Sequence, residues 1–262
     1  MRTLLRSIAF ALVALYCAAV PAQERALPLK DLRSGSSYMG ADLRAMQADA
    51  FANPGTLWVE RGAKLWSTRV GTADRACVDC HRDARDSMKG VAARYPAFDT
   101  GAKRLFDLEG RINQCRSVRQ GAAAMASESD ELLGLSAFVA SHSRGMPVKV
   151  AIDGGAAPHF ERGRMLYARR IGQMNLACLH CHEHNAGRRL LAETISQGHS
   201  NAYPIYRLEW QALGSLQRRL RACYSGVRAE LPPYNAPDLL DLSLFLAWRG
   251  EGLAVESPGI RR

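Results

Sequence analysis

The chain has 262 residues, of which 47% are hydrophobic and 23% are charged. This composition is typical of a globular protein and excludes an intrinsically disordered chain. The formal net charge of +10 favours anions or acidic proteins as partners, and the length suffices for two modest domains or one large one.

The N-terminal segment has the pattern of a secretory signal peptide. Residues 1–22 read MRTLLRSIAFALVALYCAAVPA, with a basic start, an apolar run and small residues near Ala22. We predict cleavage after Ala22, loss of Cys17 with the signal, and export to a bacterial periplasm. An exported protein is not expected to bind nucleic acid, and no later apolar run is long enough to span a bilayer. Residues 23–55 are predicted to form a less regular leader that packs on the first module of the chain.

From residue 56 onward the chain contains two copies of one pattern. The matched stretches are RGAKLW and RGRMLY, ACVDCH and ACLHCH, YPAF and YPIY, RINQCRSVR and RLRACYSGVR, and LSAFVASHSRG and LSLFLAWRG. Apolar residues here recur at helical spacing, whereas the alternation typical of strands is scarce. We therefore predict two copies of one helical module, at 56–147 and 148–262, joined through the Gly- and Pro-containing segment 145–158.

Each module contains one Cys-x-x-Cys-His motif, which indicates a covalently bound haem. The two thiols can form thioethers with the haem vinyl groups, and the histidine can ligate the iron. Structural zinc, a thioredoxin-like dithiol and a disulfide framework are the alternatives, but zinc would need a second close pair of ligands and the dithiol a strand–helix context. We predict a mainly α fold of two repeated cytochrome c-like modules, each binding one covalent haem c. The thioether cysteines are Cys77, Cys80, Cys178 and Cys181, and the proximal iron ligands are His81 and His182.

The second axial ligand is predicted to be a cysteine in both modules. Neither methionine nor lysine follows His182, which leaves His184, His199 and Cys223 as strong ligands on that side. His184 is too close in sequence to reach the opposite face of the haem, and His199 has no counterpart in the first module. Cys223 has the counterpart Cys115, because each lies 20 residues after a Tyr-Pro pair. We therefore predict thiolate ligation by both; the alternative is a Cys115–Cys223 disulfide between the modules.

The two motifs, the two lone cysteines and the stretch QRRLRACYSGVRAE around Cys223 resemble the SoxA family, the c-type cytochrome subunits of the SoxAX complexes of sulfur-oxidising bacteria. The resemblance runs from about Tyr38 to Glu256 and matches the diheme form. It implies an L-cysteine S-thiosulfotransferase that oxidatively joins thiosulfate to a cysteine of a SoxYZ-like carrier protein and releases two electrons to cytochrome c. It also implies a heterodimer with a small monohaem SoxX-like subunit, and a catalytic Cys223 whose sulfur can carry a persulfide.

Arginines near Cys223 suit the binding of a sulfur oxyanion. Arg219 lies four residues before Cys223 and therefore on the same face of the predicted helix. Its guanidinium can bind a sulfonate bidentately and favour the thiolate form of the cysteine. We predict that Arg219 is a catalytic residue and that Arg249 is a further anion contact. Arg111 has the same spacing before Cys115, so the alternative is that both spaced arginines serve haem propionates.

Two other functions compete with sulfur chemistry. A diheme electron-transfer cytochrome would need neither an arginine beside Cys223 nor a carrier protein, and the sequence leaves this alternative open. A diheme peroxidase needs an open or displaceable iron position, which the lack of a downstream methionine or lysine disfavours. A thiolate ligand also lowers the haem potential and closes the iron to oxygen, so it favours chemistry at the sulfur.

Overall fold

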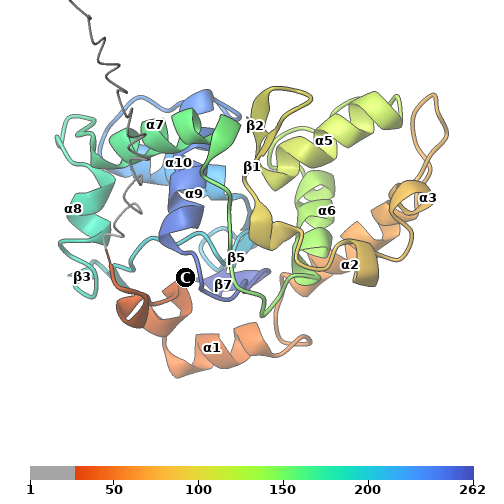
Figure 1. Ribbon diagram of the computed structural model, residues 1–262. Coiled ribbons are helices and arrows are strands. Elements are labelled where there is room, and N and C mark those ends of the chain that lie inside the picture. The colour runs from red at the N-terminus through yellow and green to blue at the C-terminus, as the bar shows by residue number, and fades with distance from the viewer. Residues whose placement is uncertain (1–26) are drawn as a thin grey trace, which may run out of the picture.

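The computed structural model describes residues 27–262, so the predicted signal peptide at 1–22 and Cys17 lie outside the described residues. Within residues 27–262, no helix combines the length and the apolarity needed to cross a membrane. Two groups of helices lie side by side, one from the first half of the chain and one from the second (Figure 1). The fold is mainly α, as predicted, with only short strands.

The first half is a set of helices around one short hairpin. Its helices are α2 Thr56–Trp66, α3 Cys77–His81, α4 Ala84–Ser87, α5 Leu108–Arg119 and α6 Asp130–Ser141, with the 3-10 turn η3 Ala92–Arg94 and the strands β1 Ala97–Asp99 and β2 Arg104–Phe106. Helices α5 and α6 begin at side-chain caps, because Asp107 accepts from the Gly110 N–H and Ser129 accepts from the Leu132 N–H.

The second half has the same order of principal elements. Its helices are α7 Ala157–Ala168, α8 Cys178–His182, α9 Leu216–Gly226 and α10 Pro237–Arg249, after the 3-10 turn η4 Gly154–Ala156. Its strands are β3 Arg189–Leu190, β4 Glu193–Thr194, β5 Ile205–Arg207, β6 Ala212–Gly214 and β7 Gly259–Arg261. Strand β7 pairs in parallel with β5 and has no counterpart in the first half. Most side chains of α10 are buried, and this helix forms much of the largest hydrophobic core.

A glycine in each half allows the first long helix to pack closely on the last one. A Cβ on Gly62 of α2 would lie 2.1 Å from the carbonyl oxygen of Gly134 in α6. A Cβ on Gly163 of α7 would lie 2.1 Å from the carbonyl oxygen of Asp241 in α10. Both glycines belong to the repeated stretches RGAKLW and RGRMLY, so the repeat in the sequence reflects a shared helix crossing.

A hairpin precedes the helix that carries the lone cysteine in each half. Strands β1 and β2 pair with Asp99 opposite Arg104, and β5 and β6 pair with Arg207 opposite Ala212. Helices α5 and α9 then begin directly after their hairpins. The hairpin and the cysteine helix are therefore built in the same way twice.

The two halves meet where α5 and α9 begin. Gln217 Nε2 of α9 donates to the Asp107 carboxylate at 2.6 Å, and the Ser215 hydroxyl donates to Glu128. Leu213 packs with Leu133 of α6 in a small apolar cluster beside these polar contacts. The interface combines apolar packing with side-chain hydrogen bonds that cross between the halves.

The leader packs mainly on the second half, which differs from the prediction. It contains η1 Leu29–Asp31, η2 Gly35–Tyr38 and α1 Ala41–Ala48. Asn53 Nδ2 donates to the Pro258 carbonyl at 2.9 Å, and the Ile260 N–H donates to Gln47 Oε1 at 2.9 Å. Arg144, at the end of the first half, donates to the Gln47 carbonyl. The physical reason is strand β7, whose backbone and flanking residues supply partners for the polar side chains of the leader.

Candidate functional site

The second Cys-x-x-Cys-His motif forms the short helix α8. The Ala177 N–H donates to His180 Nδ1 at 2.9 Å, which satisfies the first turn of the helix. His182 Nδ1 donates to the Ser196 carbonyl at 2.8 Å, so Nε2 keeps its lone pair for a metal. A Cβ on Gly198 would lie 2.7 Å from Cγ of His182. The imidazole is therefore held in one tautomer between a backbone carbonyl and a close-packed glycine.

Helix α9 brings Cys223 to this motif. Cys223 lies close enough to Cys178 and Cys181 that its charge raises the pKa of both thiols. Burial raises the pKa of Cys223, but its hydrogen bond with His182 and the positive charge of Arg219 outweigh burial, and the pKa lies below its ordinary value. The site therefore favours the thiolate of Cys223, which is both the better nucleophile and the better iron ligand.

Arg219 faces Cys223, whereas the neighbouring arginines of α9 are used elsewhere. Cys223 is the strongest electrostatic neighbour of Arg219. Arg218 lies over an indole ring, 4.1 Å from its centroid, and Arg221 donates to a backbone carbonyl. Among the ion pairs of residues 27–262, none within 4.0 Å involves Arg219. Its half-buried guanidinium therefore remains available to an anion beside the Cys223 sulfur.

Two residues near Cys223 were missed by the sequence reasoning. Arg207 on β5 is only 4% exposed, and its positive charge also lowers the pKa of Cys223. It is held by Glu193 at 3.0 Å and Glu209 at 2.7 Å. Burial raises the pKa of Tyr203, while Arg219 and Arg207 act in the opposite sense, so its phenol lies among the charges of this site. The signal for both residues in the sequence is the second Tyr-Pro pair of the repeat, which includes Tyr203 and lies directly before β5.

The first motif forms helix α3 with a similar local structure. The Ala76 N–H donates to the Asp79 carboxylate at 3.0 Å, which takes the place of the histidine cap in α8. The His81 ring lies 5.6 Å from the Trp66 ring. His81 is exposed, whereas His182 is half-buried. The two motifs therefore share their backbone but differ in how the histidine is supported.

Cys115 on α5 approaches the first motif, but its arginine is neutralised. Burial and the nearby Cys115 raise the pKa of Cys77, which places the two sulfurs in one region. Burial raises the pKa of Cys115, in contrast to Cys223. Arg111 Nη2 forms an ion pair with Asp99 at 2.6 Å, and its guanidinium lies over the Phe106 ring at 4.6 Å. The same sequence spacing therefore produces an engaged arginine in the first half and a free one in the second.

The lone cysteines lie with different motifs. Cys115 neighbours Cys77, whereas Cys223 neighbours Cys178 and Cys181. The six cysteines of residues 27–262 are all free. The arrangement gives each Cys-x-x-Cys-His motif one further cysteine, which matches the predicted grouping of sulfurs and disfavours a Cys115–Cys223 disulfide.

Arg249 is buried and already engaged. Its side chain pairs with Glu183 at 3.1 Å, donates to the Gln197 carbonyl at 3.0 Å and lies over the Tyr167 ring at 4.5 Å. An anion contact from Arg249 would have to compete with the Glu183 carboxylate. The geometry therefore favours Arg219 over Arg249 as the anion contact.

The residues around the second motif fit a haem. His182 presents Nε2, and the thiols of Cys178 and Cys181 lie on the same short helix. Nearby buried polar atoms, namely Tyr167 Oη, His199 Nδ1 and Arg249 Nε, have no hydrogen-bond partner among the described residues. Burial lowers the pKa of His199 to about 3, with Arg249 and His182 acting in the same direction. The Tyr167 hydroxyl and the Arg249 guanidinium are donors that suit the carboxylates of a haem, whereas His199 Nδ1 is an acceptor, because Nε2 of this neutral imidazole donates to Gln197 Oε1 at 3.0 Å.

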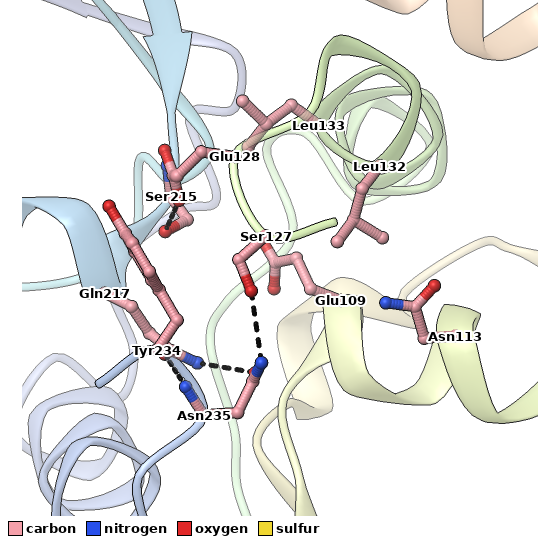
Figure 2. A pocket seen from close by; sticks show the side chains of 10 residues that line it. All are labelled: Glu109, Asn113, Ser127, Glu128, Leu132, Leu133, Ser215, Gln217, Tyr234 and Asn235. Atoms are coloured by element: carbon pink, nitrogen blue, oxygen red, sulfur yellow. Dashed lines mark hydrogen bonds between the residues drawn. The ribbon is translucent and has the colours of Figure 1, made fainter. Parts of the chain in front are cut away.

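A pocket elsewhere in the molecule has no part in this site. It lies between the halves, where Glu109, Glu128, Ser215 and Asn235 are among its lining residues (Figure 2). No cysteine lines it. Burial, followed by the charge of Asp107, raises the pKa of Glu109 to about 8, so this carboxyl is mostly protonated at neutral pH.

Comparison with known proteins supports the cytochrome c interpretation. Residues 61–148 match the family described as SoxA/TsdA, cytochrome c domain. The chain is 40% identical over 236 residues to the L-cysteine S-thiosulfotransferase subunit SoxA of Pseudaminobacter salicylatoxidans, covering 90% of this chain and 82% of that protein. It is 38% identical to the SoxA subunit of Rhodovulum sulfidophilum, covering 88% and 80%. The crystal structure of SoxXA from P. pantotrophus superposes with a TM-score of 0.85 at 35% identity, covering 88% of this chain and 87% of that one.

Proposed function

Because this chain belongs to the SoxA family, we propose that it is the subunit of an L-cysteine S-thiosulfotransferase that joins thiosulfate to a cysteine of a carrier protein. It is a c-type cytochrome with covalently bound haem. We extend this to two haems, one on each Cys-x-x-Cys-His motif, with Cys77, Cys80, Cys178 and Cys181 as the thioether cysteines. The proposed axial ligands are His81 with Cys115 and His182 with Cys223.

The observation that carries the function is the difference between the two arginines. Arg219 lies beside Cys223 without an ion-pair partner among the described residues, whereas Arg111 is neutralised by Asp99 at 2.6 Å. A cytochrome that only transfers electrons could use such a half-buried cation to hold a haem propionate, but that role would not require it beside a thiolate, because burying an unpaired charge is unfavourable. An anionic substrate would provide the missing partner.

The reaction assigns a role to each residue of the site. Arg219 binds the sulfonate end of thiosulfate and directs its outer sulfur toward the Cys223 sulfur. The positive charges of Arg219 and Arg207 favour the deprotonated form of Cys223, so its sulfur is ready to bond to sulfur. The thiol of the carrier then takes over the thiosulfate unit. Overall, the carrier thiol and thiosulfate form one S–S bond and release one proton and two electrons, for which the bound haem supplies one-electron redox chemistry.

The proposed partners follow from the family. They are a small monohaem SoxX-like subunit in a heterodimer, a SoxYZ-like carrier and thiosulfate. The formal net charge of +10 suits both the anionic substrate and an acidic carrier. We place the mature protein in the periplasm, on the basis of the predicted signal peptide at residues 1–22.

The decisive experiment follows electron release from the complete complex. Haem-loaded protein with its partner subunit is mixed with thiosulfate, with or without a carrier that has one free cysteine. We expect reduction of cytochrome c together with a mass increase on the carrier that corresponds to one thiosulfate. Thiosulfate-dependent reduction with no change in the carrier would favour the diheme electron-transfer alternative.

A further inference from the structure

The hairpin and cysteine helix of the two halves can be aligned without a gap, and one aligned position reverses its charge. The segment from Tyr95 to Cys115 and the segment from Tyr203 to Cys223 have equal length. The last residue of the first strand is Asp99 in one hairpin and Arg207 in the other. Each stands opposite the first residue of the second strand in the same register.

In the first half, the acidic residue at this position forms an ion pair with Arg111, the arginine four residues before Cys115. Asp99 Oδ2 lies 2.6 Å from Arg111 Nη2, and both side chains are 26% exposed. Arg111 also donates to Gln114 and lies over the Phe106 ring. Its charge is therefore neutralised, and its donors are largely used, before any anion could reach Cys115.

In the second half, the residue at this position cannot form an ion pair with Arg219, the arginine four residues before Cys223, because it is itself a cation. Arg207 is 4% exposed and is fixed by Glu193 at 3.0 Å and Glu209 at 2.7 Å. These two carboxylates influence Arg219 electrostatically, but neither forms an ion pair with it within 4.0 Å. Because Arg207 is a cation, it also adds positive charge on the Cys223 side of the hairpin. Arg219 therefore keeps both its charge and its donors.

We propose that the strand position occupied by Asp99 and Arg207 determines which half binds thiosulfate: the carboxylate disables Arg111, and Arg207 keeps Arg219 free. Arg207 is thus a specificity-determining residue that acts through Arg219 and through the local charge, and it does not itself touch the substrate. This inference rests on the proposed function, because it concerns the binding of the same anion.

Two substitutions of Arg207 test the proposal in the haem-loaded complex. Arg207→Asp introduces the carboxylate of the first half, and Arg207→Gln removes the positive charge, together with the ion pairs to Glu193 and Glu209, without introducing a carboxylate. We expect Arg207→Asp to raise the KM for thiosulfate at least tenfold and Arg207→Gln to raise it by about two- to fivefold. The KM for the carrier and the haem absorption spectrum should stay as in the wild type, which a general loss of structure would not allow. An unchanged KM in Arg207→Asp, or equal effects of the two substitutions, would overturn the proposal.

The reciprocal substitution Asp99→Arg tests the proposal even if the variants at the buried Arg207 fail to retain haem. It should release Arg111 and create a second binding site. The number of thiosulfate molecules bound per chain, measured by equilibrium dialysis with labelled thiosulfate, should then rise from one to two. A count that stays at one would contradict the inference. Failure of the proposed function itself would look different, because the wild-type complex would then not attach thiosulfate to the carrier at all.

Discussion

Replacing Arg219 by alanine should slow thiosulfate transfer without disturbing the haems. The substitution removes a half-buried guanidinium that has Cys223 as its strongest electrostatic neighbour and has no ion-pair partner among the described residues. A bidentate, charge-assisted contact to an anion contributes about 1.5–3 kcal/mol. Its loss corresponds to a decrease in kcat/KM for thiosulfate of roughly ten- to a hundredfold.

Arg111→Ala is the matched control, because Arg111 occupies the same position before Cys115. Its guanidinium is bound to Asp99 at 2.6 Å and packs on the Phe106 ring. Removing it should lower the free energy of unfolding by about 1 kcal/mol, since the ion pair is only partly buried. The rate of thiosulfate transfer should stay within about twofold of the wild type, because this arginine has no role in substrate binding.

The assay measures thiosulfate-dependent reduction of cytochrome c with a saturating carrier, and haem absorption spectra serve as the test of integrity. The reasoning requires a large rate loss with intact spectra in Arg219→Ala and a small one in Arg111→Ala. Equal rate losses in the two variants, each with altered haem spectra, would mean that both arginines merely support the cofactor.

Three further predictions address the cofactors and the interface between the halves. The mass of the mature protein should exceed that of its polypeptide by about 1.2 kDa, at roughly 0.6 kDa for each of two haems; an increase of about half that value would contradict the second site. In electron paramagnetic resonance, Cys115→Ala and Cys223→Ala should each change the low-spin signal of one haem, and an unchanged signal would remove that cysteine as a ligand. The pKa of Glu109 is raised from 4.5 to about 8, so the folded state holds this proton more tightly than the unfolded state. The contribution of Glu109 to stability is therefore present below pH 4.5 and is lost as the pH rises toward 8. Relative to Glu109→Gln, the wild type should lose on the order of 3–4 kcal/mol between pH 5 and 8 in denaturant titrations; parallel pH profiles would refute this.

Much of the architecture could be predicted because it depends on local spacing. Cys-x-x-Cys-His spans little more than one helical turn, so its thiols and imidazole are brought together wherever that turn forms. The periodicity of apolar residues indicated a mainly helical fold, and the matched stretches RGAKLW and RGRMLY indicated a repeat; the helix crossings that their glycines allow were seen only in the structure. The grouping of each lone cysteine with its own motif also followed from the repeat.

Other features depend on contacts that sequence spacing does not reveal. The leader was expected on the first module, but Asn53 bonds to Pro258 and Gln47 bonds to Ile260, across more than 200 positions of the chain. Arg249 was expected to face an anion, but it is buried against Glu183. Such pairings depend on which surfaces meet when the helices pack.

The sequence by itself determined the repeated motifs, the helical elements and the cysteines that can hold haem, because each depends on residues within a few turns of one another. The tertiary structure alone distinguished Arg111 from Arg219, which stand at identical positions before their cysteines. That distinction depends on a strand end, where Asp99 forms an ion pair with Arg111 and where Arg207, at the corresponding position, pairs with Glu193. The charge at a strand end decides whether an arginine is neutralised or free, and only folding brings that strand end to the helix.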